Sequence, residues 1–245
     1  MRVSVITVAY NAADTIADTL ASVAEQTHHD IEHIVVDGAS SDSTMDVVRR
    51  FGHVTRCLSE PDRGIYDAMN KGLALATGDV VGFLNADDAF ARPDILERVS
   101  SLMAEEKVDL CFADVVYQRD GRVLRRYSSA RFRPSRLRFG WEPAHPTCYV
   151  RSDFFERVGK FSLDYRISAD YEWMLRAFLE FYASWRYVPE VWVRMKPGGV
   201  STRGLQSWLL QNREIVRACR SHGIRTNLAI VLSKTPWKVM ELWRK

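Results

Sequence analysis

Two adjacent carboxylates, Asp87 and Asp88, follow a short apolar run in the first half of the chain. That run, residues 80–84, has the composition of a buried strand, so the acids must lie at or beyond its carboxyl end. In open α/β sheets this edge is where ligands bind. Paired carboxylates repel each other unless a cation or hydrogen-bond donors hold them, and a hard divalent ion that also binds substrate phosphates fits such a pair. We therefore predict a metal-assisted phosphate site here, with capping of the next helix as the alternative.

The elements before this run alternate between strand and helix. Strands are predicted at residues 3–9, 32–36 and 55–58, and helices at residues 14–27, through residue 50, and after the turn at residues 60–64. Strands that alternate with helices indicate a parallel sheet that is covered on both faces. This is the expected fold class, α/β with a mostly parallel central sheet.

The ends of the first two strands carry groups that suit a nucleotide. Asp37 closes the second strand and could hydrogen-bond a ribose or a base, and Tyr10 and Asn11 beside it could supply stacking and further hydrogen bonds. The dinucleotide fingerprint GxGxxG is missing, because the first turn reads AYNAAD, and the Walker A pattern is missing too. The sequence therefore favours a nucleotide pocket that handles phosphate through a metal rather than through a glycine-rich loop.

Length and composition set the broad class. The 245 residues, 47% of them hydrophobic, fit either one large α/β domain or one domain with extensions. The four cysteines are scattered without a CxxC pair, which argues against a zinc site and a disulfide framework and suits a reducing cytosol. We expect no signal peptide and no spanning helix, because no apolar run approaches the ~20 residues that crossing requires.

Charge is unevenly distributed along the chain. Residues 1–120 hold 10 Lys/Arg and 21 Asp/Glu, whereas residues 121–245 hold 24 and 10 together with all seven tryptophans. An acidic half suits metal-assisted handling of a phosphorylated ligand, and a basic, Trp-rich half suits an anionic acceptor or a membrane surface. A solvated basic face is the alternative.

The second half begins with a predicted helix at residues 94–106 and a hairpin of strands at residues 109–117 and 122–127 around Asp120-Gly121. Residues 128–143 are basic and irregular, and we expect a mobile loop or lid there. Arginines alternate in it with aromatic residues, but no nucleic-acid fold signature accompanies them, so a nucleic-acid partner is rejected.

Several of these segments together resemble a known family. VITVAYN, IVVDGASSDST, SEPDRGIYDAMNKGLALATGD and FLNADD occur in that order, followed by HPTCYV, LDYRISADYEWMLR and GGVST, over roughly residues 3–202. The chain resembles family 2 glycosyltransferases of the GT-A fold, most of all the bacterial exopolysaccharide and lipopolysaccharide branch that includes colanic-acid enzymes. The resemblance implies an α/β GT-A domain over residues 1–222, with helices on both faces of a mostly parallel sheet.

The resemblance also implies roles for single residues. The nucleoside and donor site would comprise Thr7, Tyr10, Asn11, Asp37, Asp62, Gly64, Asn70 and Lys71. Gly64 would permit a tight turn that a Cβ would block. Lys71 would reach a donor phosphate or else be a plain surface lysine.

The metal motif of the family is Asp-x-Asp, and this chain departs from it with Asn85-Ala86-Asp87. Asparagine is a weaker ligand for a hard cation but can hydrogen-bond a ribose. Asp87 is then the main carboxylate for Mn²⁺ or Mg²⁺, and Asp88 is expected to cap the next helix. His145, as a neutral imidazole, would complete the metal shell or contact the phosphates, or else be structural.

An inverting transfer needs a carboxylate that takes the proton of the acceptor hydroxyl. In related enzymes an acid at the start of one helix does this, and Asp170 matches that position, with Glu172 as the fallback. The alternative is that Asp170 only caps the helix, where the helix N-terminus would stabilise its charge.

The last segment, residues 223–245, contains Trp237 and Trp243 among lysines and arginines, which fits either an interfacial contact with an anionic leaflet or a helix packed on the domain. We expect a cytoplasmic enzyme, peripheral on the inner face of the plasma membrane. It would transfer a sugar from a nucleotide-diphosphate sugar to a glycan, or to a lipid-linked glycan, in cell-surface polysaccharide biosynthesis.

Two other functions remain as alternatives. A binding or scaffold protein on a degenerate transferase fold is suggested by Asn85, whereas Asp87 and Asp170 speak against it. A sugar-phosphate nucleotidylyltransferase would need a glycine-rich, arginine-containing loop after the first strand, and the turn AYNAAD lacks it.

Overall fold

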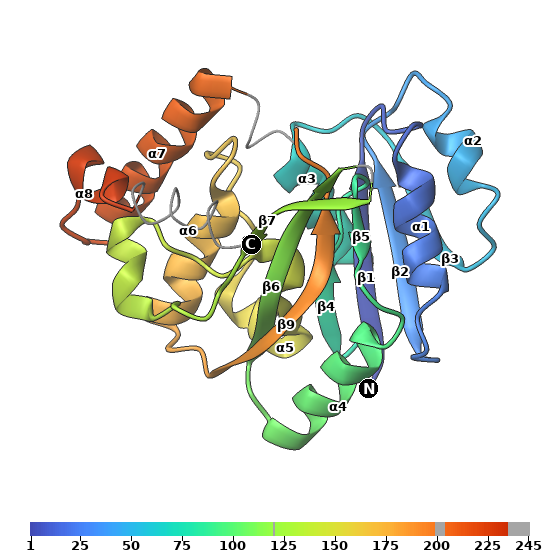
Figure 1. Ribbon diagram of the computed structural model, residues 1–245, viewed down its shortest axis with the longest axis horizontal. Coiled ribbons are helices and arrows are strands. Elements are labelled where there is room, and N and C mark those ends of the chain that lie inside the picture. Colours follow the sequence, from blue (N-terminus) through green and yellow to red (C-terminus); the bar gives the residue numbers. More distant parts are fainter. Residues whose placement is uncertain (120, 199–203, 235–245) are drawn as a thin grey trace.

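The computed structural model describes residues 1–119, 121–198 and 204–234. One sheet of nine strands runs through the molecule in the order β3-β2-β1-β4-β8-β6-β9-β5, with β7 paired to β6 (Figure 1). Its first four strands are all parallel and comprise β1 (Val3–Ala9), β2 (Ile31–Asp37), β3 (Val54–Ser59) and β4 (Val80–Phe83). Their carboxyl ends therefore lie at one edge.

The second half of the sheet mixes directions. It comprises β8 (Tyr149–Arg151), β6 (Leu110–Arg119), β7 (Arg122–Tyr127), β9 (Trp185–Met195) and β5 (Asp88–Phe90). β8 is antiparallel to both β4 and β6, while β9 is parallel to β6. The predicted hairpin is confirmed, because β6 and β7 pair in antiparallel register.

Helices cover both faces of the parallel strands, as predicted. Along β2, Val35 packs with α1 (Ile16–Ala24) and α2 (Thr44–Val48), whereas Ile34 and Val36 pack with α3 (Ile65–Leu75). This alternation follows from the two-residue period of a strand. α4 (Ile95–Glu106) covers the start of β1, β4 and β6.

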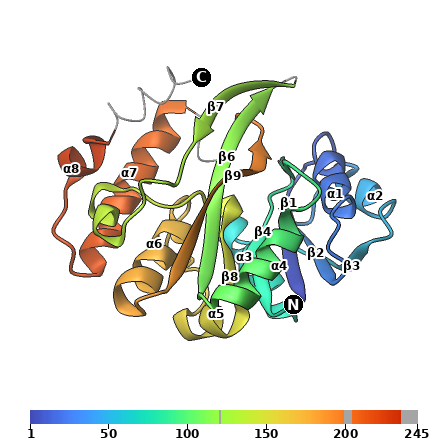
Figure 2. The same ribbon diagram turned by 60° about the horizontal axis from the view of Figure 1, so that its bottom comes forward.

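The remaining helices gather beyond the second half of the sheet. They are α5 (Ser152–Val158), α6 (Ala169–Leu175) with its π-helical continuation η3 (Arg176–Glu180), α7 (Gly204–Ser221) and α8 (Leu228–Leu232). Two short 3₁₀ helices, η1 (Pro134–Phe139) and η2 (His145–Thr147), precede them. α7 and α8 lie at the opposite end of the molecule from α1 and α2 (Figures 1 and 2). Among the described helices, none combines the length and the apolar composition needed to cross a bilayer.

The predicted mobile lid at residues 128–143 is wrong. This segment contains η1 and is anchored by Phe132 and Leu137, both of which are buried in the main core. The hydroxyl of Tyr171 on α6 also donates to the carbonyl oxygen of Leu137. The apolar residues among the arginines are therefore packing anchors, and packing outweighed the irregular, basic composition.

Candidate active site

Asp37 is fixed at the carboxyl edge of β2. Its carboxylate is buried and accepts hydrogen bonds from the backbone N–H of Ser40 at 3.0 Å, the hydroxyl of Ser59 at 2.6 Å, and the hydroxyl of Ser40. Ser59 is the last residue of β3 and lies opposite Asp37 in the parallel register. The parallel pairing of β2 and β3 thus holds one carboxylate at the predicted nucleotide edge.

Two of the predicted donor residues, Tyr10 and Asp62, meet at Gly38, which follows Asp37. A Cβ at Gly38 would lie 2.4 Å from Oδ2 of Asp62 and 3.3 Å from the ring of Tyr10, whose side chain is 67% exposed. Oδ1 of Asp62 accepts the N–H of Gly64 at 2.8 Å, and Gly64 has φ 120°, a value that favours glycine. The result is an open aromatic face beside a fixed carboxylate, suited to a base and its ribose.

Asn11 and Thr7 support this edge through hydrogen bonds to the segment that contains β2 and the loop after it. The side-chain oxygen of Asn11 accepts the N–H of Ser41 at 2.9 Å, which joins the loop after β1 to the loop after β2. Thr7 is fully buried, and its hydroxyl lies 3.0 Å from Nε2 of His33 within the two strands. The structure therefore places Thr7 beneath the predicted nucleotide position, as a supporting residue.

Asn70 and Lys71 on α3 both have hydrogen-bond partners within the protein. The amide of Asn70 donates to the carbonyl oxygen of Phe161 and accepts its N–H, both at 2.9 Å. The ammonium of Lys71 donates to the carbonyl oxygen of Pro61 at 2.7 Å and pairs with Glu60 at 2.8 Å, and the bond to Glu60 raises its pKa. Lys71 therefore stabilises the donor turn and Asn70 joins α3 to the backbone of Phe161, and direct donor contact by either one stays a prediction.

The motif after β4 has an unusual amide. The side-chain oxygen of Asn85 is buried without a hydrogen-bond partner, while its nitrogen donates to Asp88 at 3.3 Å. Asp88 is itself buried, and both burial and the charge of Asp87 raise its pKa well above the ordinary value. The prediction that Asp88 caps the next helix is wrong, because Asp88 begins β5, where it pairs with Met195 of β9.

The oxygen atoms present suit a hard cation. The half-buried Asp87 and the unpartnered oxygen of Asn85 are the type of ligand that Mg²⁺ and Mn²⁺ take. Within the described ranges, no group of three His, Cys, Asp or Glu side chains could hold a metal alone. Substrate phosphates and water would fit as further ligands of a bound ion, the arrangement that Mg²⁺ usually adopts.

His145 lies in an aromatic cage. Its ring stacks on Phe83, with centroids 5.5 Å apart, and meets the edge of Phe161 at 5.8 Å. Burial lowers its pKa, an effect that the charge of Asp170 partly offsets. Its Nε2 atom is buried without a hydrogen-bond partner. A neutral imidazole with one unsatisfied nitrogen could serve a ligand or a phosphate, and its place in a metal shell remains a prediction.

Asp170 lies in the first turn of α6 and is half-buried. Its Oδ1 atom accepts the N–H of Tyr171 at 2.9 Å and lies 2.8 Å from the hydroxyl of Tyr66, whose single proton is shared with the carbonyl oxygen of Ile167 at 2.6 Å. The structure shows no side-chain cap at this helix start. Tyr66 comes from α3, which begins directly after Gly64. One helix thus connects the donor turn to the predicted base, a role of Tyr66 that no local sequence signal reveals.

The two other carboxylates near α6 have structural partners. Glu172 is buried and bonds Arg176 at 2.8 Å and His222 at 3.1 Å, so it is committed to an ion-pair network. Glu214 of α7, also buried, accepts three backbone N–H groups of residues 166–168, at 2.8, 2.9 and 3.0 Å. Glu214 therefore fixes the loop that leads into Asp170, and the fallback role of Glu172 as base is not supported.

Comparison with known proteins places these features in context. The model of the family described as "Glycosyl transferase family 2" matches residues 4–162. The PGL/p-HBAD biosynthesis glycosyltransferase of Mycobacterium bovis BCG is 32% identical over 242 residues, which cover 97% of this chain and 91% of that protein. An uncharacterized glycosyltransferase of Mycobacterium tuberculosis H37Rv is 35% identical over 187 residues, covering 72% of this chain and 69% of that one.

Solved structures share the same fold at low sequence identity. TarS residues 1–349 of S. aureus in complex with UDP-GlcNAc superposes with a TM-score of 0.72 at 19% identity, over 95% of this chain and 71% of that one. The mannosyltransferase PcManGT of Pyrobaculum calidifontis, in complex with GDP-Man and Mn²⁺, superposes with a TM-score of 0.69 at 21% identity. The match covers 99% of this chain and 73% of that one. The predicted GT-A fold is confirmed by these likenesses.

Proposed function

The chain belongs to glycosyl transferase family 2, and from this premise we propose that it is an inverting enzyme that transfers a sugar from a nucleotide-diphosphate sugar to a glycan acceptor. The observation that carries the proposal is the shared helix α3. It begins at the Asp62–Gly64 turn beside the nucleotide edge and carries Tyr66, which bonds Asp170. This arrangement would hold a donor-binding edge and an acceptor base in one rigid frame.

Asp37, Tyr10 and Asp62 would orient the nucleoside, with Asn85 accepting a ribose hydroxyl at its unpartnered oxygen. Asp87 would hold a Mn²⁺ or Mg²⁺, which when bound would offset the charge that develops on the departing diphosphate. Structural neighbours that bind UDP-GlcNAc, or GDP-Man with Mn²⁺, support the choice of donor class and ion.

Asp170 would take the proton of the acceptor hydroxyl as that oxygen attacks the anomeric carbon from the face opposite the leaving nucleotide. The hydrogen bond from Tyr66 fixes one carboxylate oxygen, which leaves the other for the acceptor. Attack from the opposite face inverts the anomeric centre.

For the acceptor we propose a lipid-linked glycan of cell-surface polysaccharide synthesis, reached from the cytoplasmic side of the plasma membrane. The basic composition of residues 121–245 supports this. We keep residues 223–245 as a separate membrane-contacting segment, although α8 packs on α7 and η1. Residues 235–245, with Trp237 and Trp243, lie outside the described residues. Removal of residues 235–245 should release the enzyme from membranes, and unchanged membrane association would contradict this part.

The deciding experiment is calorimetric titration with UDP, GDP and CDP, each with and without Mn²⁺. We expect one diphosphate to bind, with affinity that Mn²⁺ raises in the wild type but not in Asp87→Ala. Asp30→Ala is a matched control, since this exposed carboxylate lies just before β2, at the opposite edge of the parallel strands, and its ion pair is with Arg2.

The outcomes separate the parts of the proposal. Absence of binding for every nucleotide under both conditions would overturn the transferase function and leave the fold without its chemistry. Binding that Mn²⁺ does not change would retain the enzyme and remove Asp87 from its proposed role.

A further inference from the structure

A cavity lies between η1, α7 and α8, at the end of the molecule away from the nucleotide edge. It has a volume of about 470 Å³ and is lined by Arg138, Arg220 and Arg225, by the loop at residues 223–227, and by Ile224 and Ile230. A pocket of this size can enclose a small polar headgroup. The helices α7 and α8, which supply part of its lining, lie at the end of the molecule opposite α1 and α2 (Figures 1 and 2).

The three arginines have no counter-charge in the part of the chain that the structure describes. Arg220 donates through Nε to the carbonyl oxygen of Thr226 at 3.3 Å, and Arg138 lies over the ring of Phe139, but neither these two nor Arg225 pairs with a carboxylate of the described residues. The surrounding residues 131–140 and 204–234 carry nine Lys or Arg and one acid, Glu214, which is buried and engaged elsewhere.

A cavity on the other side of the molecule shows the contrast. That cavity, of about 560 Å³ between α1, β5 and β9, is lined by acidic Asp18, Glu25 and Asp87 as well as basic Arg194 and Lys196, and Asp18 pairs with Lys196 at 2.8 Å. This cavity contains charges of both signs, whereas the charges of the arginine cavity are all positive and repel one another until an anion binds.

We propose that the arginine cavity is a binding site for a phosphoryl group. Guanidinium groups match phosphate geometry through paired N–H donors, and they do so better than an ammonium point charge. Ile224 and Ile230 in the same wall provide apolar contact for whatever carries the phosphate, as in a phospholipid headgroup or a lipid-linked diphosphate.

The cavity is connected to the catalytic helix through its wall. The hydroxyl of Thr226 donates to the carbonyl oxygen of Arg138 at 2.7 Å. The carbonyl oxygen of the adjacent Leu137 accepts a hydrogen bond from the hydroxyl of Tyr171, the residue that follows Asp170 on α6. The phosphoryl group therefore belongs to the acceptor or to the membrane that bears it, an assignment that rests on the proposed function.

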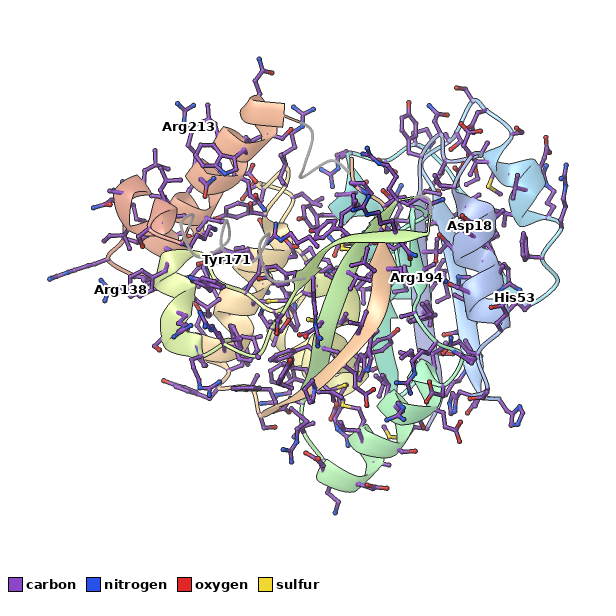
Figure 3. All side chains as sticks on the ribbon, in the orientation of Figure 1. Asp18, His53, Arg138, Tyr171, Arg194 and Arg213 are labelled. Carbon is purple, nitrogen blue, oxygen red and sulfur yellow. The ribbon has the colours of Figure 1, made fainter. Side chains whose placement is uncertain are left out.

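Titration with pyrophosphate in EDTA at low salt tests the site itself, because chelation removes metal-assisted binding at the donor edge. We expect the wild type to bind and Arg220→Ala or Arg138→Ala to weaken binding roughly tenfold, since one charge-assisted pair is lost. Arg213→Ala is the matched control, because Arg213 is exposed on the same helix and lies outside the cavity (Figure 3). It should change affinity less than about twofold.

A second arm identifies the source of the phosphate. Vesicles of phosphatidylglycerol that displace pyrophosphate, where phosphatidylcholine vesicles do not, would identify a lipid headgroup, and displacement by neither would identify a soluble phosphate. Equal losses for Arg213→Ala and Arg220→Ala, pyrophosphate binding that neither cavity variant weakens, or no binding by the wild type would overturn the proposal. The assay contains no sugar nucleotide, so its failure is distinct from failure of the transferase function.

Discussion

At the scale of single residues, the hydrogen bond from Tyr66 to Asp170 gives the most direct test of the predicted base. Tyr66→Phe removes that bond, together with the one to the carbonyl oxygen of Ile167, but keeps the ring packed against Phe161. Because hydrogen bonds to charged groups contribute about 1.5–3 kcal/mol, kcat should fall roughly ten- to a hundredfold while the nucleotide Kd stays constant. Steady-state kinetics measure kcat, and calorimetry measures the nucleotide Kd. Tyr182→Phe, at an 81% exposed position, is the control, and an unchanged kcat in Tyr66→Phe would show that the bond does not position the base.

The buried histidine beneath the nucleotide edge predicts a pH effect on stability. Burial, and then the neighbouring His53, lower the pKa of His33 to about 3. In the unfolded chain this histidine takes up a proton near pH 6.5, whereas in the folded chain it stays neutral down to about pH 3. Its contribution to the free energy of unfolding is therefore complete above about pH 6.5 and is lost progressively as the pH falls below that value. The loss from this residue should be about 1.4 kcal/mol per pH unit, or about 2 kcal/mol between pH 7 and pH 5.

Urea denaturation at the two pH values checks this effect. His33→Gln should be less stable at pH 7, because its contacts with Thr7 and His53 are altered, yet its free energy of unfolding should change less between the two values. His29→Gln, at an exposed position, should keep the wild-type pH dependence. Equal pH slopes in all three proteins would contradict the argument.

At the scale of elements, α7 positions the loop before α6 through one carboxylate. Glu214→Gln keeps the shape of the side chain but replaces a charged acceptor of three N–H groups by a neutral amide. We expect kcat to fall about tenfold, with the nucleotide Kd unchanged and faster hydrogen exchange at residues 166–168. Glu156→Gln, on the exposed face of α5, serves as the control. Loss of kcat without faster exchange in that loop would assign Glu214 some other role.

The same scale shows what the sequence could predict. The parallel strands β1 to β4 and the helices between them were predictable because their hydrophobic periods are local. β5 was missed because its three residues become a strand only by pairing with β9, about a hundred residues later. Tyr66 and Glu214 were missed for a related reason, since their partners Asp170 and residues 166–168 lie 46 to 104 residues away along the chain. The mistaken lid arose from composition, because the burial of Phe132 and Leu137 depends on helices that follow them.

At the scale of the whole molecule, the predicted nucleotide residues and the predicted base lie toward different ends. Asp37 lies at the β2–β3 end, near α1 and α2, whereas Asp170 lies on α6, beside α7 (Figure 1). The acidic half of the sequence forms the first end and the basic half forms the second. Substitutions at the two ends should therefore change different measured quantities.

The final prediction follows from this division. Asp37→Asn should weaken nucleotide binding roughly tenfold or more, because a charged acceptor held by two serines becomes neutral. Asp170→Asn should leave nucleotide binding intact and slow transfer about a hundredfold or more, as expected when a general base is removed. Because the two residues share no partner, the double variant should show the Kd of the first and the kcat of the second. Titration and single-turnover transfer measure both quantities, and a raised Kd in Asp170→Asn alone would show that the donor and acceptor ends are coupled through α3 rather than independent.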